Sequence, residues 1–117
     1  MDPRDLNLDW NRPQRTNSPA HDLITSLNAQ LVWLDHHKKP HEIVRIFYSG
    51  AFGVLRAVRI SPEGADFIAV TVKEDTGAEH VIVAPVSQCS FMFSVVVPTA
   101  GEPEEKVILG FAEGRET

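Results

Sequence analysis

The sequence predicts a mainly β fold with one N-terminal α-helix, arranged as a small antiparallel β-barrel or sandwich of five to six strands. Three observations lead to this fold class. A helical pattern of apolar residues lies between residues 18 and 40. After residue 42, short runs rich in β-branched and aromatic residues alternate with glycine and proline turns. Finally, a chain of 117 residues suits one domain with its own core.

Residues 18–40 carry the signals of a complete helix. Ser18 is a favourable N-cap, and Pro19 suits the first helical position. Apolar residues then recur at helical spacing from Leu23 to Leu34, so one face of this helix packs against the strands. Pro40 ends the helix, because proline blocks its continuation.

The strands follow from residue 43 onwards. Ser61–Gly64 reads as a type I turn, with proline second and glycine fourth, and residues 74–77 form the next turn. Pro85 breaks or bends the path of the chain. The expected strands span residues 43–48, 52–60, 66–73, 78–84, 86–97 and 106–112. We therefore expect a domain at 18–112, preceded by an extension at 1–17 and followed by a short tail at 113–117.

The extension contains a short alternation of apolar and polar residues. An extended segment would place three apolar side chains on one face, those of Leu6, Leu8 and Trp10. A segment this short does not fold alone. It therefore docks on its own domain, docks on another copy as an arm, or stays in solvent.

Two later stretches are apolar on both faces, which is unusual for a half-buried strand. Residues 91–97 and 107–111 would promote aggregation if they lay exposed at a sheet edge. They are therefore central, covered by the helix, or paired with another chain, and we expect such pairing for at least one of them. The expected partner is a second copy or another protein. The predicted interaction residues are Leu6, Leu8, Trp10, Phe91, Phe93, Val107, Leu109 and Phe111.

Charge and cysteine content limit the partners and the compartment. The net charge of −5 disfavours general nucleic-acid binding, although residues 1–60 hold 8 basic and 6 acidic residues while residues 61–117 hold 3 and 10. This asymmetry permits a local basic patch, or head-to-tail association between copies. One cysteine, no signal-like N-terminus and no long apolar run predict a cytoplasmic protein without membrane contact.

Five basic residues are candidates for binding an anion or a nucleic acid: Lys38, Lys39, Arg45, Arg56 and Arg59. Arg56 and Arg59 have opposite parity on one strand, so a regular strand would point them to opposite faces. A β-bulge or a strong twist is needed to bring them together. The simpler alternative is an ordinary solvated face.

Metal binding and catalysis receive little support from the sequence. His36, His37 and His41 are close in sequence, but Pro40 interrupts them, and Cys89 is the only cysteine that could complete a zinc site. Cys89 itself lies in an apolar stretch typical of a core cysteine. We predict no catalytic residue, no metal and no cofactor, and a metal-dependent enzyme is the least favoured reading.

The order of elements over residues 18–97, with Gly50 after the first strand, resembles that of the Sm-like small barrels. This resemblance implies a ring-forming, RNA-binding protein as an alternative function. The chain departs from the family in its tight glycine spacing, in the lack of the usual Asp or Asn signals at the third-strand turn, and in its negative charge. The first reading of the sequence is instead a non-catalytic binding or assembly module that associates through strand edges.

Overall fold

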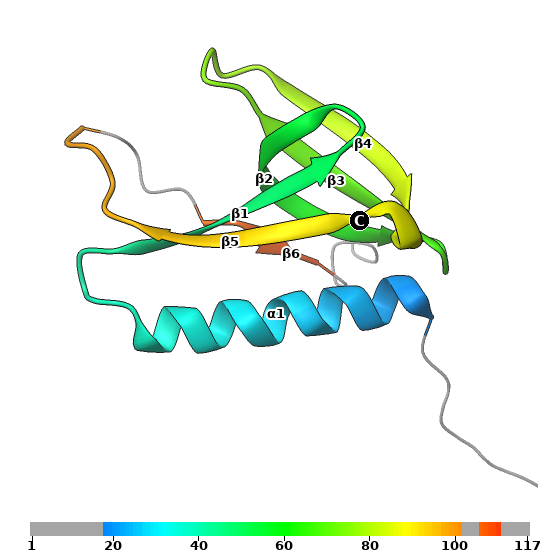
Figure 1. The fold of residues 1–117 in the computed structure, drawn as a ribbon, viewed down its shortest axis with the longest axis horizontal. Helices are drawn as coiled ribbons and strands as arrows, with labels where there is room; N and C mark the ends of the chain where they lie inside the picture. Colours follow the sequence, from blue (N-terminus) through cyan, green and yellow to red (C-terminus); the bar gives the residue numbers. More distant parts are fainter. Residues whose placement is uncertain (1–17, 102–105, 111–117) are drawn as a thin grey trace, which may run out of the picture.

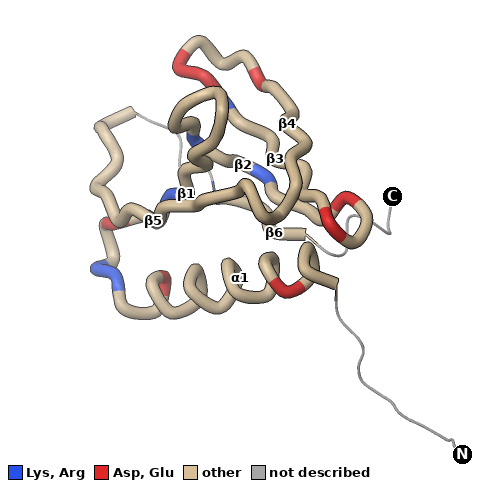
Figure 2. The backbone as a smooth tube through the Cα atoms, turned by 45° about the vertical axis from the view of Figure 1, so that its right-hand side comes forward, with Lys and Arg blue, Asp and Glu red and all other residues tan. Residues whose placement is uncertain are grey.

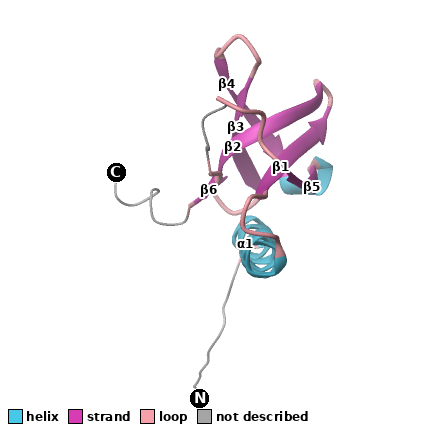
Figure 3. Ribbon diagram, turned by 90° about the vertical axis from the view of Figure 1, so that its left-hand side faces the viewer, coloured by secondary structure: helices cyan, strands magenta, loops and turns pink. Residues whose placement is uncertain are grey.

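The computed structural model describes residues 18–101 and 106–110. One long helix, α1 (Pro19–His37), lies along one side of a curved six-stranded sheet (Figure 1) and is seen end-on in Figure 3. The mainly β fold with one N-terminal helix is therefore confirmed. In the described part of the chain, no helix has the length and apolar character needed to cross a membrane.

The sheet is built from consecutive antiparallel strands, with one exception. Its order is β4-β3-β2-β1-β5, so the first four strands form a meander and β5 returns to the far side of β1. The short β6 pairs with β2 in parallel. Strands β4 and β5 end the sheet without pairing to each other, which leaves it open rather than closed into a barrel. The strands are β1 (Ile43–Gly50), β2 (Gly53–Glu63), β3 (Phe67–Lys73), β4 (Glu79–Pro85), β5 (Ser90–Val96) and β6 (Ile108–Leu109).

Helix α1 begins and ends where the sequence predicts. The Ser18 hydroxyl accepts a hydrogen bond from the His21 N–H at 3.1 Å and so satisfies one of the unpaired amides of the first turn. The Ala20 N–H donates to the Ala65 carbonyl at 2.9 Å, which ties the start of the helix to the turn between β2 and β3. The helix is therefore fixed to the sheet by a backbone hydrogen bond as well as by packing.

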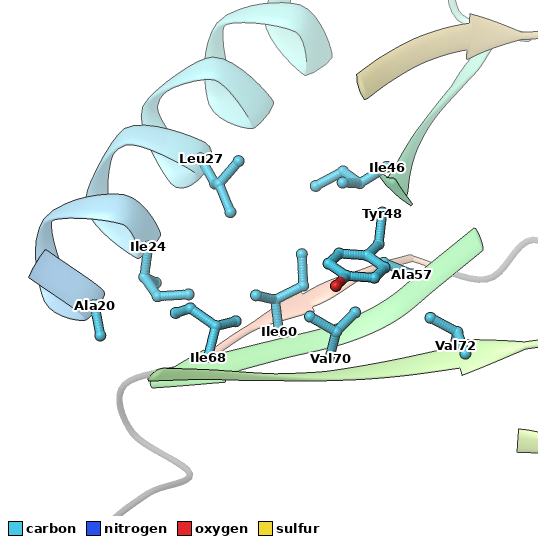
Figure 4. Packing of buried hydrophobic residues seen from close by; sticks show 10 residues of the cluster. All are labelled: Ala20, Ile24, Leu27, Ile46, Tyr48, Ala57, Ile60, Ile68, Val70 and Val72. Atoms are coloured by element: carbon cyan, nitrogen blue, oxygen red, sulfur yellow. The ribbon is translucent and has the colours of Figure 1, made fainter. Parts of the chain in front are cut away.

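The core lies between α1 and the concave face of the sheet (Figure 4). Each fully buried isoleucine or valine contributes roughly 1.5–3 kcal/mol through loss of contact with water. The helix supplies only its first two turns, because Leu31 and Leu34 of the predicted apolar stripe are half-buried. The buried cluster comprises Ala20, Ile24 and Leu27 from α1, and Ile46, Tyr48, Ala57, Ile60, Ile68, Val70 and Val72 from the strands.

The predicted type I turn at Ser61–Gly64 was wrong. Strand β2 continues through Pro62 and Glu63, which pair with Ile68 and Phe67 of β3, and the turn follows at residues 64–66. Gly64 has a φ of 71°, a left-handed conformation that glycine adopts without strain. Within the described residues, no strand pairs with the β1 side of β2 at Pro62. The missing proline N–H therefore breaks no hydrogen bond of the sheet.

The predicted fifth strand at residues 86–97 was too long. A single 3-10 turn, η2 (Val86–Gln88), separates β4 from β5, and β5 begins only at Ser90. The Val86 N–H donates to the Asp66 carbonyl at 2.9 Å, which holds η2 against the start of β3. A continuous strand could not leave the β4 end of the sheet and rejoin it beside β1. The predicted last strand is reduced to Ile108–Leu109 among the described residues.

Tyr48 fills the end of the core nearest the β1–β2 turn. Its ring lies 5.7 Å from that of Phe91, centre to centre. The ring also covers Gly50, where a Cβ atom would overlap the phenol group. Gly50 is therefore required for this close approach rather than for an unusual backbone angle. Burial raises the pKa of the Tyr48 phenol, with a smaller contribution from Cys89.

Candidate functional site

A β-bulge in β2 brings Arg56 and Arg59 to the same face of the sheet. Arg56 pairs with Lys73 and Arg59 pairs with Thr71, and the register shifts between Ala57 and Arg59. Because Lys73 and Thr71 are two residues apart on β3, they share a face, and their partners on β2 share it too. The structure therefore contains the bulge that the opposite parity of the two arginines requires. The core side keeps its apolar residues, because Ala57 and Ile60 also share a face.

The outer face of the sheet carries a basic groove with a volume of about 750 Å³. Arg45 of β1, Arg56 of β2 and Lys73 of β3 all line it, and Phe47 lies among them. Figure 2 shows basic positions along these strands and acidic positions in the turns. We refer to this surface as the outer groove. Its remaining lining residues are Val54, Leu55, Glu74, Asp75, Thr76 and Gly77.

Lys73 was missed as a candidate residue in the sequence. It lies at the end of β3, and only the strand register reveals that it is directly opposite Arg56. The sequence of β3 did contain one signal, which is the alternation of buried and less buried residues. The buried residues are Ile68, Val70 and Val72, and they alternate with Ala69, Thr71 and Lys73. This alternation places Lys73 on the outer face of the sheet, but it does not identify Arg56 as the residue opposite it on β2.

The acidic residues of the outer groove come from the β3–β4 turn. Glu74 is held by His80, with 2.7 Å between Oε2 and Nε2. His80 is the partner of Val72 in the β3–β4 pairing, and Glu74 lines the groove beside Lys73. Glu79 pairs with Lys73 from the β4 side. The groove therefore has its basic residues on β1–β3 and an acidic border at the β3–β4 turn and the start of β4.

Lys38 and Lys39 do not join this groove. They follow the C-terminal end of α1, where Lys38 Nζ lies 4.0 Å from Asp35 and lines a separate small cavity of about 160 Å³. That cavity is mainly apolar and is formed by α1, the start of β1 and Val107. The structure therefore splits the five predicted basic residues into an outer-face group on β1 and β2 and a pair at the end of the helix.

The sheet has two free edges, β4 and β5, within the described part of the chain. None of the seven residues of β5 is charged, and β4 carries a charge only at its first residue, Glu79. Val81 and Val83 on β4 have exposed fractions of 66% and 55%, and Met92 on β5 has one of 50%. These edges therefore lack the lysines, mid-strand prolines and bulges that usually block further strand pairing.

The predicted interaction residues are only partly found at these edges. Phe91 and Phe93 point inward and pack against the core, and Val107 and Leu109 do the same. The exposed residues are instead their neighbours of opposite parity, such as Met92. When both faces of a strand are apolar, the sequence alone does not show which face packs against the core. The pairing with the neighbouring strand is needed to decide it. Leu6, Leu8, Trp10 and Phe111 lie outside the described residues.

His37 and Cys89 both make local contacts within the fold. His37 Nδ1 donates to the Trp33 carbonyl at 2.8 Å, and the two rings stack 4.0 Å apart. No group of three potential metal-ligating side chains occurs in the described ranges. The Cys89 thiol donates to the Pro85 carbonyl at 3.3 Å, and burial raises its pKa. A raised pKa disfavours the reactive thiolate, as expected for a core cysteine.

Comparisons of this chain with protein-family models, with curated proteins and with solved structures give no match. Functional inference therefore depends on the outer groove and on the two sheet edges.

Proposed function

We propose that this protein is a non-catalytic assembly module whose copies associate by pairing the β4 edge of one molecule with the β5 edge of the next. The observation that carries the proposal is the absence of edge protection on both terminal strands of the described sheet. An unprotected edge offers a row of backbone donors and acceptors to any available strand. Pairing with another copy would satisfy these groups and cover the exposed apolar side chains beside them.

The two edges are suited to each other in length and in surface. Both strands have seven residues, and each presents exposed apolar side chains, Val81 and Val83 on β4 and Met92 on β5. Neither strand contains a lysine or an arginine, and the polar Glu79 and His80 lie together at the start of β4. Their pairing therefore buries apolar surface along the middle of both strands, where neither carries a charge.

A contact between unlike edges is favoured over contacts between like edges. A single β4–β5 contact, repeated from copy to copy, uses both free edges of every molecule. Symmetric contacts would need two different interfaces, one between β4 strands and one between β5 strands, to achieve the same result. Repeated head-to-tail contacts close into a ring or extend as a filament.

The test is the solution mass of the full chain, measured by size exclusion with light scattering. Wild type is expected to form multimers. Val81→Lys/Val83→Lys on β4 and Ser90→Lys/Met92→Lys on β5 are each expected to reduce the mass to that of a monomer, because lysine on an edge strand opposes further pairing. The matched control is Val32→Lys, since Val32 is a similarly exposed valine on α1. A monomeric wild type, or equal masses in all variants, would contradict the proposal.

A further inference from the structure

Positive charges on the outer face are concentrated on three neighbouring strands, β1, β2 and β3. Arg56 and Lys73 lie directly opposite each other on neighbouring strands. Directly opposed like charges destabilise a strand pair. Arg45 lines the same groove from β1, and the bulge adds Arg59 to the same face. This face thus holds four of the seven lysines and arginines in the described ranges, on a chain whose net charge is −5.

The bulge keeps this arrangement together. A regular β2 strand would direct either Arg56 or Arg59 towards the core face, whose residues are apolar. With the bulge, Ala57 and Ile60 remain buried while both arginines point outwards. Bulges are often found where a strand must re-aim a side chain next to a functional site.

The outer groove combines this charge with an apolar, aromatic surface. Phe47 pairs directly with Arg56, and both line the groove together with Val54. The groove volume of about 750 Å³ falls within the roughly 300–1,000 Å³ typical of small-molecule sites. Guanidinium groups bind phosphate oxygens through two parallel hydrogen bonds, and an aromatic ring offers a stacking surface for a planar base.

The acidic residues of the groove are placed at its border. The Glu74 carboxylate contacts His80, and Glu79 lies directly opposite Lys73 on the edge strand β4, on the side away from Arg56. Asp75 belongs to the turn that forms the wall of the groove. The region around Arg45, Phe47 and Arg56 therefore keeps its positive character, which favours an anion there over a cation.

We propose that the outer groove binds the phosphate of a nucleotide, with Arg56 and Lys73 contacting the phosphate oxygens and Phe47 contacting the base. This site is separate from the two sheet edges, so it does not depend on how the chain assembles. The same chemistry is offered by a free mononucleotide and by a nucleotide within a single strand.

The test uses the full-length protein, labelled with ¹⁵N and titrated separately with adenosine monophosphate and with a short single-stranded oligoadenylate. We expect amide shifts confined to β1, the first half of β2 and the end of β3. Shifts with both ligands would identify a mononucleotide site, whereas shifts with the oligonucleotide alone would identify a single strand as the source of the phosphate. No saturable shift with either ligand would overturn the proposal.

Variants assign the effect to the named side chains. Arg56→Gln and Lys73→Gln should each weaken binding by about tenfold or more, because each removes a charge-assisted hydrogen bond. Lys38→Gln/Lys39→Gln removes two positive charges outside the groove and should leave affinity nearly unchanged. A circular dichroism spectrum and a thermal melt verify that each variant is folded. Equal weakening by the groove and control variants would mean non-specific attraction and would overturn the proposal.

Discussion

The two faces of strands β1, β2 and β3 have opposite characters although they share the same backbone. The face towards α1 carries Ile46, Ile60 and Val70, all fully buried. The opposite face carries Arg45, Arg56 and Lys73 around the outer groove. The bulge at Val58 keeps the two faces distinct along the whole strand, because a regular strand of the same sequence would reverse the alternation of side chains beyond Ala57. The comparison shows that this bulge serves the core and the groove together.

Placing a charge on the core face of β2 should have the largest effect on stability. Ala57 is only 3% exposed, so Ala57→Arg would bury a guanidinium group among apolar side chains. We expect this variant to lose cooperative thermal unfolding in circular dichroism. Val54→Arg places the same charge on the outer face of β2, where Val54 is exposed, and should unfold cooperatively. A cooperative Ala57→Arg variant of near wild-type stability would show that the two faces do not differ in this way.

Truncating a core side chain should have the next largest effect on the free energy of unfolding. Ile60→Ala is expected to lower the free energy of unfolding by about 2–5 kcal/mol, because it leaves a cavity among fully buried neighbours. Val54→Ala on the outer face of β2 should change it by no more than about 0.5 kcal/mol, because Val54 is exposed and lies away from both sheet edges. Urea unfolding measures both values. Similar losses in the two variants would mean that the outer face contributes to stability as the core does.

The smallest effect on the free energy of unfolding should come from ionisation of Tyr48 at alkaline pH. Its pKa is about 10 in the unfolded chain and higher in the folded protein, so the folded state retains the proton that the unfolded state loses. The free energy of unfolding should therefore fall as the pH rises above about 10. This decline should be weaker in Tyr48→Phe. Tyr48 is the only tyrosine, so its ultraviolet absorbance follows the titration directly, and an unshifted midpoint in the folded protein would contradict its burial.

Much of the fold was predictable because its signals are local. The Ser18-Pro19 cap, the stop before Pro40 and the turn at residues 74–77 all appear as expected in the structure. The errors arose where a distant partner decides the outcome. Ser61–Glu63 form a strand because β3 pairs with them, and residues 86–88 form a turn because the chain must move from β4 to β1.

The candidate site was less predictable than the fold for the same reason. Arg45 and Arg56 were identified from charge alone, but their neighbour Lys73 depends on the β2–β3 register. The exposed edge residues were missed because Phe91 and Met92 are both apolar, and residue type does not reveal which of them faces the core. Strand pairing, which joins residues far apart in the sequence, supplied the missing information.

The most direct test of edge pairing is the mass of an equimolar mixture of the β4 variant Val81→Lys/Val83→Lys and the β5 variant Ser90→Lys/Met92→Lys. Each variant retains the edge that the other has lost, so a β4–β5 contact predicts two monomers that combine into a one-to-one dimer. Contacts between like edges would instead make each variant a dimer alone, with no further association on mixing. That result, or a mixture that stays monomeric while wild type assembles, would contradict the account.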